Sequence, residues 1–409
     1  MTTTILAIFA LVYAGMILGG LPFLQLDRTG VALLGAIALV AAGAVTPAEA
    51  ARAIDLPTVL LLFSFMVVSA QMRLGGFYGA VTRRLADLPL SPSALLAALV
   101  GTVAALSAVF SNDVVCLAMA PVLADACARR GLNPVPFLLA LACAANVGSA
   151  ATLIGNPQNI LIGQALGLPF AGYFAEALLP VVLGLGLTWL VIAIQARGRW
   201  SAPPATAPPE RRDEDPPLNR WQTAKGLILT FALLAAFLLA PWPREVAALS
   251  AAGLLLMSRK MHSRKMLGLV DWELLVLFVG LFVVHHALQT TGLPARWVDV
   301  LAAQGVDLAR PVPLFGATFA LSNVVSNVPA VMLLLPVATH PVAGTMLALV
   351  STLSGNLLVV GSIANIIVVD AAARRGIAIG WRAHARVGIP VTLATLAVAA
   401  ASLAWHARG

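Results

Sequence analysis

Twelve apolar stretches follow one another along this chain, most of them close to the length that crosses a lipid bilayer. A helix needs about 20 apolar residues to span the hydrocarbon core. The stretches cover residues 5–24, 31–45, 57–72, 93–128, 136–167, 174–195, 226–241, 246–258, 272–290, 311–337, 343–372 and 387–405. Hydrophobic residues make up 60% of the sequence and charged residues only 10%, which is more apolar than a soluble core requires. The sequence therefore predicts an all-α, polytopic membrane protein.

The distribution of positive charge agrees with this class. The formal net charge is +8, but Lys and Arg occur in short clusters between the apolar stretches, as in cytoplasmic loops that orient a membrane protein. We therefore expect the lipid bilayer as the partner and no nucleic acid. The first 20 residues have no basic leading segment and no clear cleavage site, so we expect them to be a retained helix and not a signal peptide.

Cysteines and catalytic motifs point to no enzyme. Cys116 and Cys127 are eleven residues apart, roughly 16 Å along a helix, which is too far for a shared metal or a disulfide. With Cys143 they are expected to be small apolar fillers. The chain shows no HExxH motif, no paired acids and no Ser-His arrangement. We expect neither enzymatic activity nor a cofactor.

A short polar motif interrupts two of the apolar stretches in the same way. Ser111-Asn112-Asp113 lies within SAVFSNDVVCLAMAP, and Ser326-Asn327-Val328 lies within LSNVVSNVPAVMLLLP. In both copies a proline follows nine residues after the asparagine. Non-helical backbone at membrane depth is tolerated only where protein or a water-filled cavity covers it. The two interruptions therefore indicate functional breaks.

Further landmarks indicate an internal repeat. Asp55 and Asp271 each open an apolar stretch, and Gly75 and Gly292 follow these stretches. Two later segments share the pattern Gly-x-x-x-Asn; they are Gly155-Asn156-Pro157-Gln158-Asn159 and Gly361-Ser362-Ile363-Ala364-Asn365. A segment rich in proline and charge separates the halves and is expected to be a solvated linker. We predict a first repeat over 1–200, a cytoplasmic linker over 201–224 and a second repeat over 225–409.

Opposite topology of the two repeats follows from the charge clusters. If all clusters are cytoplasmic, 57–72 runs inward and 272–290 runs outward. The stretch 311–337 must then start and end outside, yet it is too short for two crossings. It is expected to be a re-entrant hairpin with Ser326-Asn327 at its tip, and 93–128 is expected to be its cytoplasmic counterpart. We predict about five spanning helices and one hairpin per repeat, with both termini outside.

The two tips and two Gly-containing breaks are expected to form one central site near the membrane midplane. Broken helices aim amide dipoles at anions and free carbonyls at cations, and Ser and Asn oxygens suit a hard cation such as sodium. The predicted binding residues are Ser111, Asn112, Asp113, Gly155, Asn156, Asn159, Ser326, Asn327, Gly361, Ser362 and Asn365. Ser111, Asn112, Ser326 and Asn327 are the candidate sodium ligands. A simpler interpretation is that each Ser-Asn pair only caps a helix.

Asp113 is the residue with the sharpest prediction. An ionisable carboxylate inside an apolar stretch costs on the order of 3 kcal/mol to insert, so it is expected to carry a proton or a cation. The alternative is a helix-start carboxylate satisfied by local amides. His285 and His286 lie near the outer end of the 272–290 stretch. They either take part in transport or reach only interfacial water.

The paired Ser-Asn tips and the Gly- and Asn-containing breaks resemble the ion transporter superfamily over nearly the whole chain. This superfamily includes arsenite permeases, D-type sodium/proton antiporters, citrate transporters and divalent-anion/sodium symporters. The resemblance implies sodium and substrate sites at the tips and a homodimer. In the dicarboxylate branch both tips usually read Ser-Asn-Thr, whereas Asp113 and Val328 replace the threonines here. An aspartate in the first tip is instead similar to the arsenite-permease and antiporter branches.

The expected function is secondary active transport of a small anion or metalloid, such as arsenite, citrate, a dicarboxylate or an inorganic anion. Coupling to protons or sodium would proceed by alternating access, in a bacterial inner membrane. No basic residue lies inside a spanning stretch, and an ionised Asp113 repels anions. A neutral species such as arsenous acid, or a cation exchanged for protons, avoids this repulsion, and sodium or protons that neutralise Asp113 would restore anion binding. The first alternative is a sodium/proton antiporter. A passive channel is a weaker one, because polar residues gather at two breaks only.

Overall fold

The computed structural model describes residues 1–21, 24–201, 216–258 and 260–406, which fold almost entirely into helices. The first half contains α1 (Thr2–Leu18), α2 (Arg28–Ala41), α3 (Pro47–Ala53), α4 (Leu56–Leu74), α5 (Phe77–Ala86), α6 (Pro92–Val109), α7 (Asn112–Arg129), α8 (Pro134–Ser149), α9 (Pro157–Ala165) and α10 (Phe170–Ala196). Two short antiparallel strands, β1 (Gly20–Leu21) and β2 (Leu26–Asp27), lie between α1 and α2. This small hairpin and an isolated bridge between Leu132 and Ser201 are the only β-structure within the described part of the chain.

The second half repeats the order of the first. It contains α11 (Arg220–Leu239), α12 (Arg244–Leu256), α13 (Ser263–Leu267), α14 (Trp272–Thr290), α15 (Leu293–Ala303), α16 (Pro311–Val325), α17 (Asn327–Leu334), α18 (Ala343–Ser354), α19 (Ile363–Ala373) and α20 (Trp381–His406), with 3-10 turns at Leu335–Val337 and Val359–Gly361. Six described helices are long and apolar enough to cross a membrane, namely α4, α6, α10, α11, α14 and α20. The fold is therefore that of a multi-span helical membrane protein.

The two aspartates that indicated an internal repeat, Asp55 and Asp271, lie at the starts of equivalent helices. The carboxylates of Asp55 and Asp271 each accept a hydrogen bond from a backbone amide three residues on, at 2.9 Å in both cases, and so cap α4 and α14. The glycine after each of these helices is Gly76 and Gly292, with φ of 70° and 68°. The pairing of Gly75 with Gly292 was one residue out of register, because only Gly76 adopts the left-handed conformation that starts α5.

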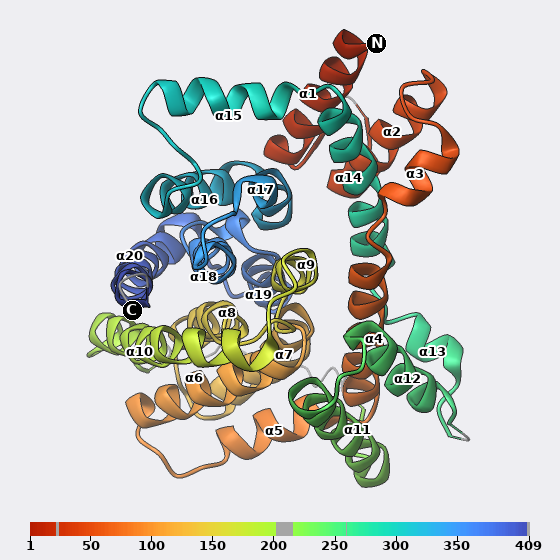
Figure 1. Cartoon of the computed structure of the whole chain (residues 1–409). Helices are drawn as coiled ribbons and strands as arrows, with labels where there is room; N and C mark the ends of the chain where they lie inside the picture. Colours follow the sequence, from red (N-terminus) through yellow and green to blue (C-terminus); the bar gives the residue numbers. More distant parts are fainter. Residues whose placement is uncertain (22–23, 202–215, 259, 407–409) are drawn as a thin grey trace.

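The helices form two groups, and each group contains helices from both halves of the chain (Figure 1). One group contains α1–α4 and α11–α14, in which α2 packs along α14 and α12 packs along α4. We call this group the frame. The other contains α6–α10 and α16–α20, in which α6 packs on α8 and α10 packs on α20. Each half thus packs its second helix against the fourth helix of the other half, as expected of two related units.

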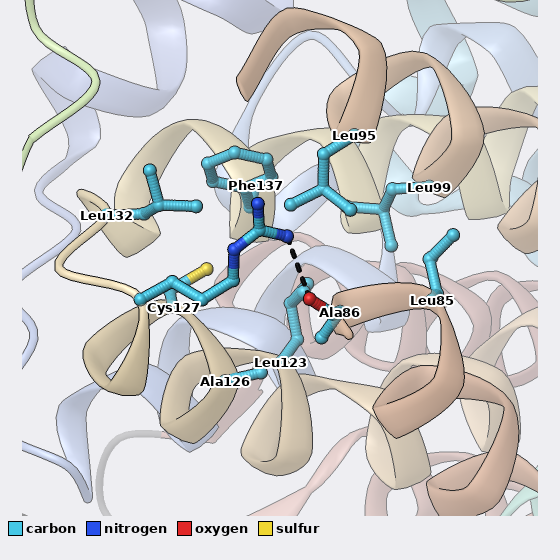
Figure 2. A pocket seen from close by; sticks show the side chains of 10 residues that line it. Leu85, Ala86, Leu95, Leu99, Leu123, Ala126, Cys127, Leu132 and Phe137 are labelled. Carbon is cyan, nitrogen blue, oxygen red and sulfur yellow. Dashed lines mark hydrogen bonds between the residues drawn. The ribbon is translucent and has the colours of Figure 1, made fainter. Parts of the chain in front are cut away.

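Two helices join the groups, and the loops beside them are held by charged side chains. In the view of Figure 1, α5 connects them at the bottom and α15 at the top, and α15 has no buried residue. Figure 2 shows a pocket lined mainly by apolar side chains such as Leu95 and Phe137. Arg130 also lines this pocket, and its guanidinium donates to the Ala86 carbonyl at 2.8 Å. Arg130 also donates to the carbonyls of Leu88 and Leu90, which fixes the loop between α5 and α6.

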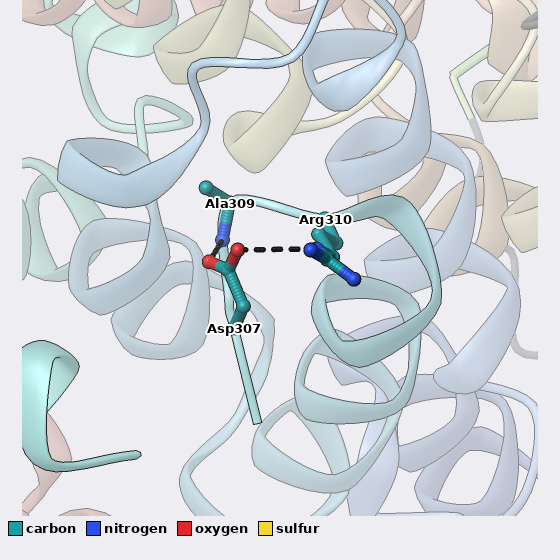
Figure 3. Close-up of polar contacts among 3 residues, drawn as sticks. All are labelled: Asp307, Ala309 and Arg310. Atoms are coloured by element: carbon teal, nitrogen blue, oxygen red, sulfur yellow. Dashed lines mark hydrogen bonds and ion pairs between the residues drawn. The ribbon is translucent and has the colours of Figure 1, made fainter. Parts of the chain in front are cut away.

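The loop before α16 is held by a smaller surface arrangement. The Asp307 carboxylate accepts from the Ala309 amide at 3.0 Å and pairs with Arg310 at 3.3 Å (Figure 3). The Arg310 side chain is largely exposed and the Asp307 side chain is partly exposed, so this pair contributes little to stability. It orients the chain where α16 begins at Pro311.

Several apolar stretches that are continuous in the sequence form two helices with a break between them. The stretches 93–128 and 311–337 each contain a helix, a break and a second helix, with the Ser-Asn pair at the break. The stretches 136–167 and 343–372 also divide, at 150–156 and 355–362. Most of the predicted linker, 202–215, lies outside the described residues, and α11 begins at Arg220, inside the range 201–224.

Candidate functional site

The two Ser-Asn pairs occupy equivalent positions between helices. Ser111 precedes α7 and Ser326 precedes α17, and the asparagine is the first helical residue in both. Ser326 has φ of 78° and ψ of 161°, and it is the one non-glycine residue with positive φ in the described ranges. Only glycine adopts this conformation readily, so the second tip stores on the order of 1–3 kcal/mol of strain. Surrounding contacts must hold it in place.

The two breaks place further polar groups beside the tips. α8 ends at Ser149 and α9 starts at Pro157, whereas α18 ends at Ser354 and α19 starts at Ile363. The predicted motifs therefore lie at the end of each break and in the first turn of the following helix. The Asn156 side chain caps α9 by accepting from the Asn159 amide at 3.0 Å. Ser362 is at the equivalent position before α19.

One cavity of about 40 Å³ is lined by both tips, by the start of α9 directly after the first break, and by the end of the second break. A volume of this size holds a few water molecules or a small ion. Its lining residues are Asn112, Asp113, Asn146, Pro157, Gln158, Leu274, Ser326, Asn327, Val328, Gly361, Ser362 and Ile363. The cavity lies where the two halves meet, because each half supplies one tip and residues at or next to one break.

Six of the predicted residues line this cavity: Asn112, Asp113, Ser326, Asn327, Gly361 and Ser362. The structure places the other five behind it. Ser111 and Asn156 line a separate, smaller and mostly apolar cavity beside α4. The Gly155 carbonyl accepts from the Asn112 amide at 3.2 Å, and a Cβ at Gly155 would lie 2.3 Å from the Ser149 carbonyl oxygen. Gly155 thus allows the first break to approach the first tip.

Asn159 and Asn365 hold the breaks from inside. The Asn159 amide nitrogen donates to the carbonyl of Thr152 at 3.0 Å and to the Tyr173 hydroxyl at 3.2 Å. The Asn365 amide nitrogen donates to the carbonyls of Gly355 and Leu358. Both side chains are fully buried. They satisfy backbone groups that the interrupted helices leave free.

Asn146 connects the parts of the site, and the sequence prediction missed it. Its amide nitrogen donates to Asn356 Oδ1 at 2.8 Å and to Asn365 Oδ1 at 3.2 Å. Its carbonyl oxygen accepts from Asn112 Nδ2 at 3.2 Å and from Ser362 Oγ at 2.9 Å. This one buried side chain therefore joins the first tip to the second break. The available signal was an asparagine in the apolar segment just before the first break.

Two other contributors to the site were also missed. Gln158 lines the cavity and donates to the Thr352 hydroxyl at 3.1 Å. Thr352 lies on α18 and also accepts from Asn156 at 3.2 Å. These bonds join the first break to the second half, as Asn146 does from the other side. Gln158 lies within the Gly-x-x-x-Asn motif Gly155–Asn159, and this position is the signal that the sequence offers for it.

Asp113 lines the cavity without a charged partner. It lies in the first turn of α7, where the helix dipole favours negative charge. Its side chain makes no hydrogen bond or ion pair with the described residues, so the interpretation of a carboxylate satisfied by local amides has no supporting contact. None of the described lining residues is Lys, Arg or His. The carboxylate is thus open to a proton, a cation or a hydroxylated solute.

The tips also present unused acceptors. Asn112 Oδ1 and Asn327 Oδ1 are buried and have no hydrogen-bond partner among the described residues. Buried polar atoms are almost always paired. One unpaired carbonyl oxygen in each tip, both beside the cavity, fits a bound group that donates hydrogen bonds or a hard cation such as sodium. Among all the described residues of the chain, there is no group of three His, Cys, Asp or Glu side chains able to hold a metal ion.

The histidine pair lies away from the cavity. His285 is buried and its Nε2 is 2.5 Å from the Tyr13 hydroxyl. Of the two alternatives for this residue, contact with interfacial water alone does not fit its burial. His286 is half-buried. Neither side chain lines the cavity.

Comparison with known proteins identifies the family. Residues 5–353 match the family model CitMHS, described as citrate transporter. The chain belongs to this family. The protein is 28% identical to the silicon efflux transporter LSI3 of Oryza sativa, over 92% of both chains. It is 31% identical to the inner membrane protein YbiR of Escherichia coli, over 81% of this chain and 83% of that protein.

The fold is shared with a solved transporter. A crystal structure of the Alcanivorax borkumensis YdaH transporter superposes with a TM-score of 0.61 at 15% identity, over 99% of this chain and 98% of that one. Family and fold together confirm the resemblance to the ion transporter superfamily. The protein is a multi-pass membrane transporter and not an enzyme.

Proposed function

We propose that the protein is a secondary active transporter that moves a small, uncharged hydroxylated solute through the cavity between the two tips, coupled to protons or sodium. Arsenous acid and silicic acid are solutes of this kind. The observation that carries the proposal is the lining itself. It combines amides, hydroxyls and the unpartnered carboxylate of Asp113, with no basic side chain.

This lining discriminates between substrate classes by charge. A citrate or dicarboxylate ion would meet an ionised Asp113 with no Lys or Arg to offset it, and like charges repel strongly at short distance. It would bind only with Asp113 neutralised by a proton or sodium. A neutral hydroxylated acid avoids this cost, and its hydroxyl groups can donate to the unpaired oxygens of Asn112 and Asn327. The named function of LSI3, silicon efflux, supports the same class.

Alternating access is proposed from the arrangement of the halves. Helices α1–α10 and α11–α20 repeat in order, and each half gives the cavity one tip and residues at or next to one break. Charge clusters that lie on one side of the membrane give the halves opposite topology, with the breaks at the midplane and both tips as re-entrant hairpins. Exchange of conformation between such halves opens one site to each side in turn. Single cysteines at Ser111 and Ser326 should then be labelled from opposite sides.

Sodium/proton antiport is the second candidate. It is favoured by the unpaired Asn112 and Asn327 oxygens, because these residues line the same cavity as the Asp113 carboxylate and together provide oxygen ligands suited to sodium. Asp113 would then bind sodium and protons in turn.

The proposed location is a bacterial inner membrane, as the name of YbiR supports. A homodimer is proposed by family resemblance and is testable by the mass of the detergent-solubilised protein.

The test uses proteoliposomes with a preformed pH gradient and an internal pH dye. Silicic or arsenous acid should collapse the gradient through the wild-type protein, and Asp113→Asn should lose this response. Asp307→Asn, which neutralises an exposed carboxylate in the α15–α16 loop, is the matched control and should behave as wild type. Collapse by sodium alone establishes the antiporter. Collapse by citrate alone, or an unchanged response in Asp113→Asn, contradicts the proposal.

A further inference from the structure

A second buried polar contact connects the first helix to the second tip. The Tyr13 hydroxyl on α1 lies 2.5 Å from His285 Nε2 on α14 and donates to the Pro329 carbonyl at 3.2 Å. These groups are separated by 272 and 316 residues in the sequence. Pro329 is two residues after Asn327, in the first turn of α17. The contact therefore acts on the segment that carries the strained Ser326.

The surroundings of this contact are apolar. The Phe9 ring stacks on Tyr13 with centroids 4.4 Å apart and meets the His285 ring edge-on at 6.2 Å. The first residues of α17 after Asn327 are apolar as well. Within the described chain no other hydrogen bond joins α17 to α1 or α14. A single hydroxyl thus makes the polar connection between the frame and the second tip.

The hydroxyl has only one proton, and this determines which partner can act as donor. A tyrosine that donates to the Pro329 carbonyl must accept from its other partner. His285 must therefore present an N–H at Nε2 to the Tyr13 oxygen. If Nε2 were an acceptor, the Tyr13 proton would turn toward His285 and the Pro329 carbonyl would lose this bond. His285 thus orients Tyr13, and Tyr13 holds the tip.

We propose that Tyr13 and His285 are positioning residues that latch the second tip, Ser326-Asn327, against the frame. The inference rests on the proposed function in one respect, namely that this tip lines the transport cavity. The latch opposes the release of the backbone strain at Ser326, which no side-chain cap on α17 relieves. Opening of the cavity at this tip then requires the bond to Pro329 to break.

The experiment measures how readily the tip opens. Val328 lines the cavity beside the tip, and Val328→Cys gives a reporter in a background where Cys116, Cys127 and Cys143 are alanine. The rate of labelling by a small methanethiosulfonate reagent follows the open population. Tyr13→Phe and His285→Leu should each raise this rate about fivefold, the change expected for losing one hydrogen bond.

The variants separate a latch from general damage. The double variant Tyr13→Phe/His285→Leu should label no faster than either single variant, because both remove the same bond. His285→Gln keeps an N–H donor and should restore a rate close to wild type. Tyr78→Phe removes another buried tyrosine hydroxyl, on α5 away from α17, and should leave the rate unchanged. Size-exclusion profiles in detergent show which variants are folded.

Two results overturn the latch. One is a wild-type labelling rate in Tyr13→Phe, which decides the matter even if His285→Leu does not fold. The other is an additive increase in the double variant. Because labelling needs neither substrate nor gradient, these results are independent of the flux assay on Asp113→Asn. Failure of that assay contradicts the proposed function and leaves the labelling result intact.

Discussion

Replacement of Asn146 by alanine should both destabilise the protein and stop transport. The side chain makes four hydrogen bonds at 2.8–3.2 Å to Asn112, Asn356, Asn365 and Ser362. At about 1 kcal/mol each, the loss of these four bonds costs about 4 kcal/mol. Water entering from the adjacent cavity can satisfy some of the partners and lower this cost. We expect the free energy of unfolding to fall by about 2–4 kcal/mol.

The measurement is SDS-induced unfolding in mixed micelles, followed by flux in proteoliposomes. Thr392→Val is the matched control, because the Thr392 hydroxyl is buried on α20 and makes no hydrogen bond to the described residues. Removing such a group is neutral or mildly stabilising. If Asn146→Ala unfolds within about 0.5 kcal/mol of wild type and retains flux, Asn146 does not join the tip to the break, and the reasoning fails.

Three further changes test how the tips and their supports are built. Ser326→Gly should leave the free energy of unfolding unchanged or raise it by about 1 kcal/mol, because glycine accepts the positive φ. Flux should fall, because the hydroxyl is lost. A large destabilisation in unfolding assays would contradict the strained conformation of Ser326. Asp55→Ala and Asp271→Ala should each lower the free energy of unfolding by about 1 kcal/mol, because each removes a helix cap. Cysteines placed near the starts of α4 and α14 should be labelled faster in these variants, and labelling at the wild-type rate would contradict the caps. Arg130→Lys should lower the free energy of unfolding by about 1–2 kcal/mol, because an ammonium group cannot donate to the three carbonyls with the geometry of the guanidinium. Limited proteolysis in the α5–α6 loop should increase. An unchanged cleavage rate would show that these hydrogen bonds do not hold the loop.

The sequence by itself determined the features whose signal is local. A polar pair inside an apolar stretch is costly in a membrane, so Ser111-Asn112 and Ser326-Asn327 marked helix breaks without any knowledge of packing. Asp55 and Asp271 marked helix starts because a cap acts on amides within three residues. The helical class followed from composition, and the superfamily from the order of these motifs.

Only the tertiary structure decided which polar groups meet. Asn146 and Asn356 are 210 residues apart, and Tyr13 and His285 are 272 apart. No local pattern distinguishes these side chains from other polar residues in apolar helices. Of the predicted residues, Gly361, Ser362 and those at the tips other than Ser111 line the cavity. Asn159 and Asn365 instead satisfy the backbone of the breaks. The reason is physical: a break is encoded where it occurs, but its partners are chosen by helices that pack from the other half of the chain.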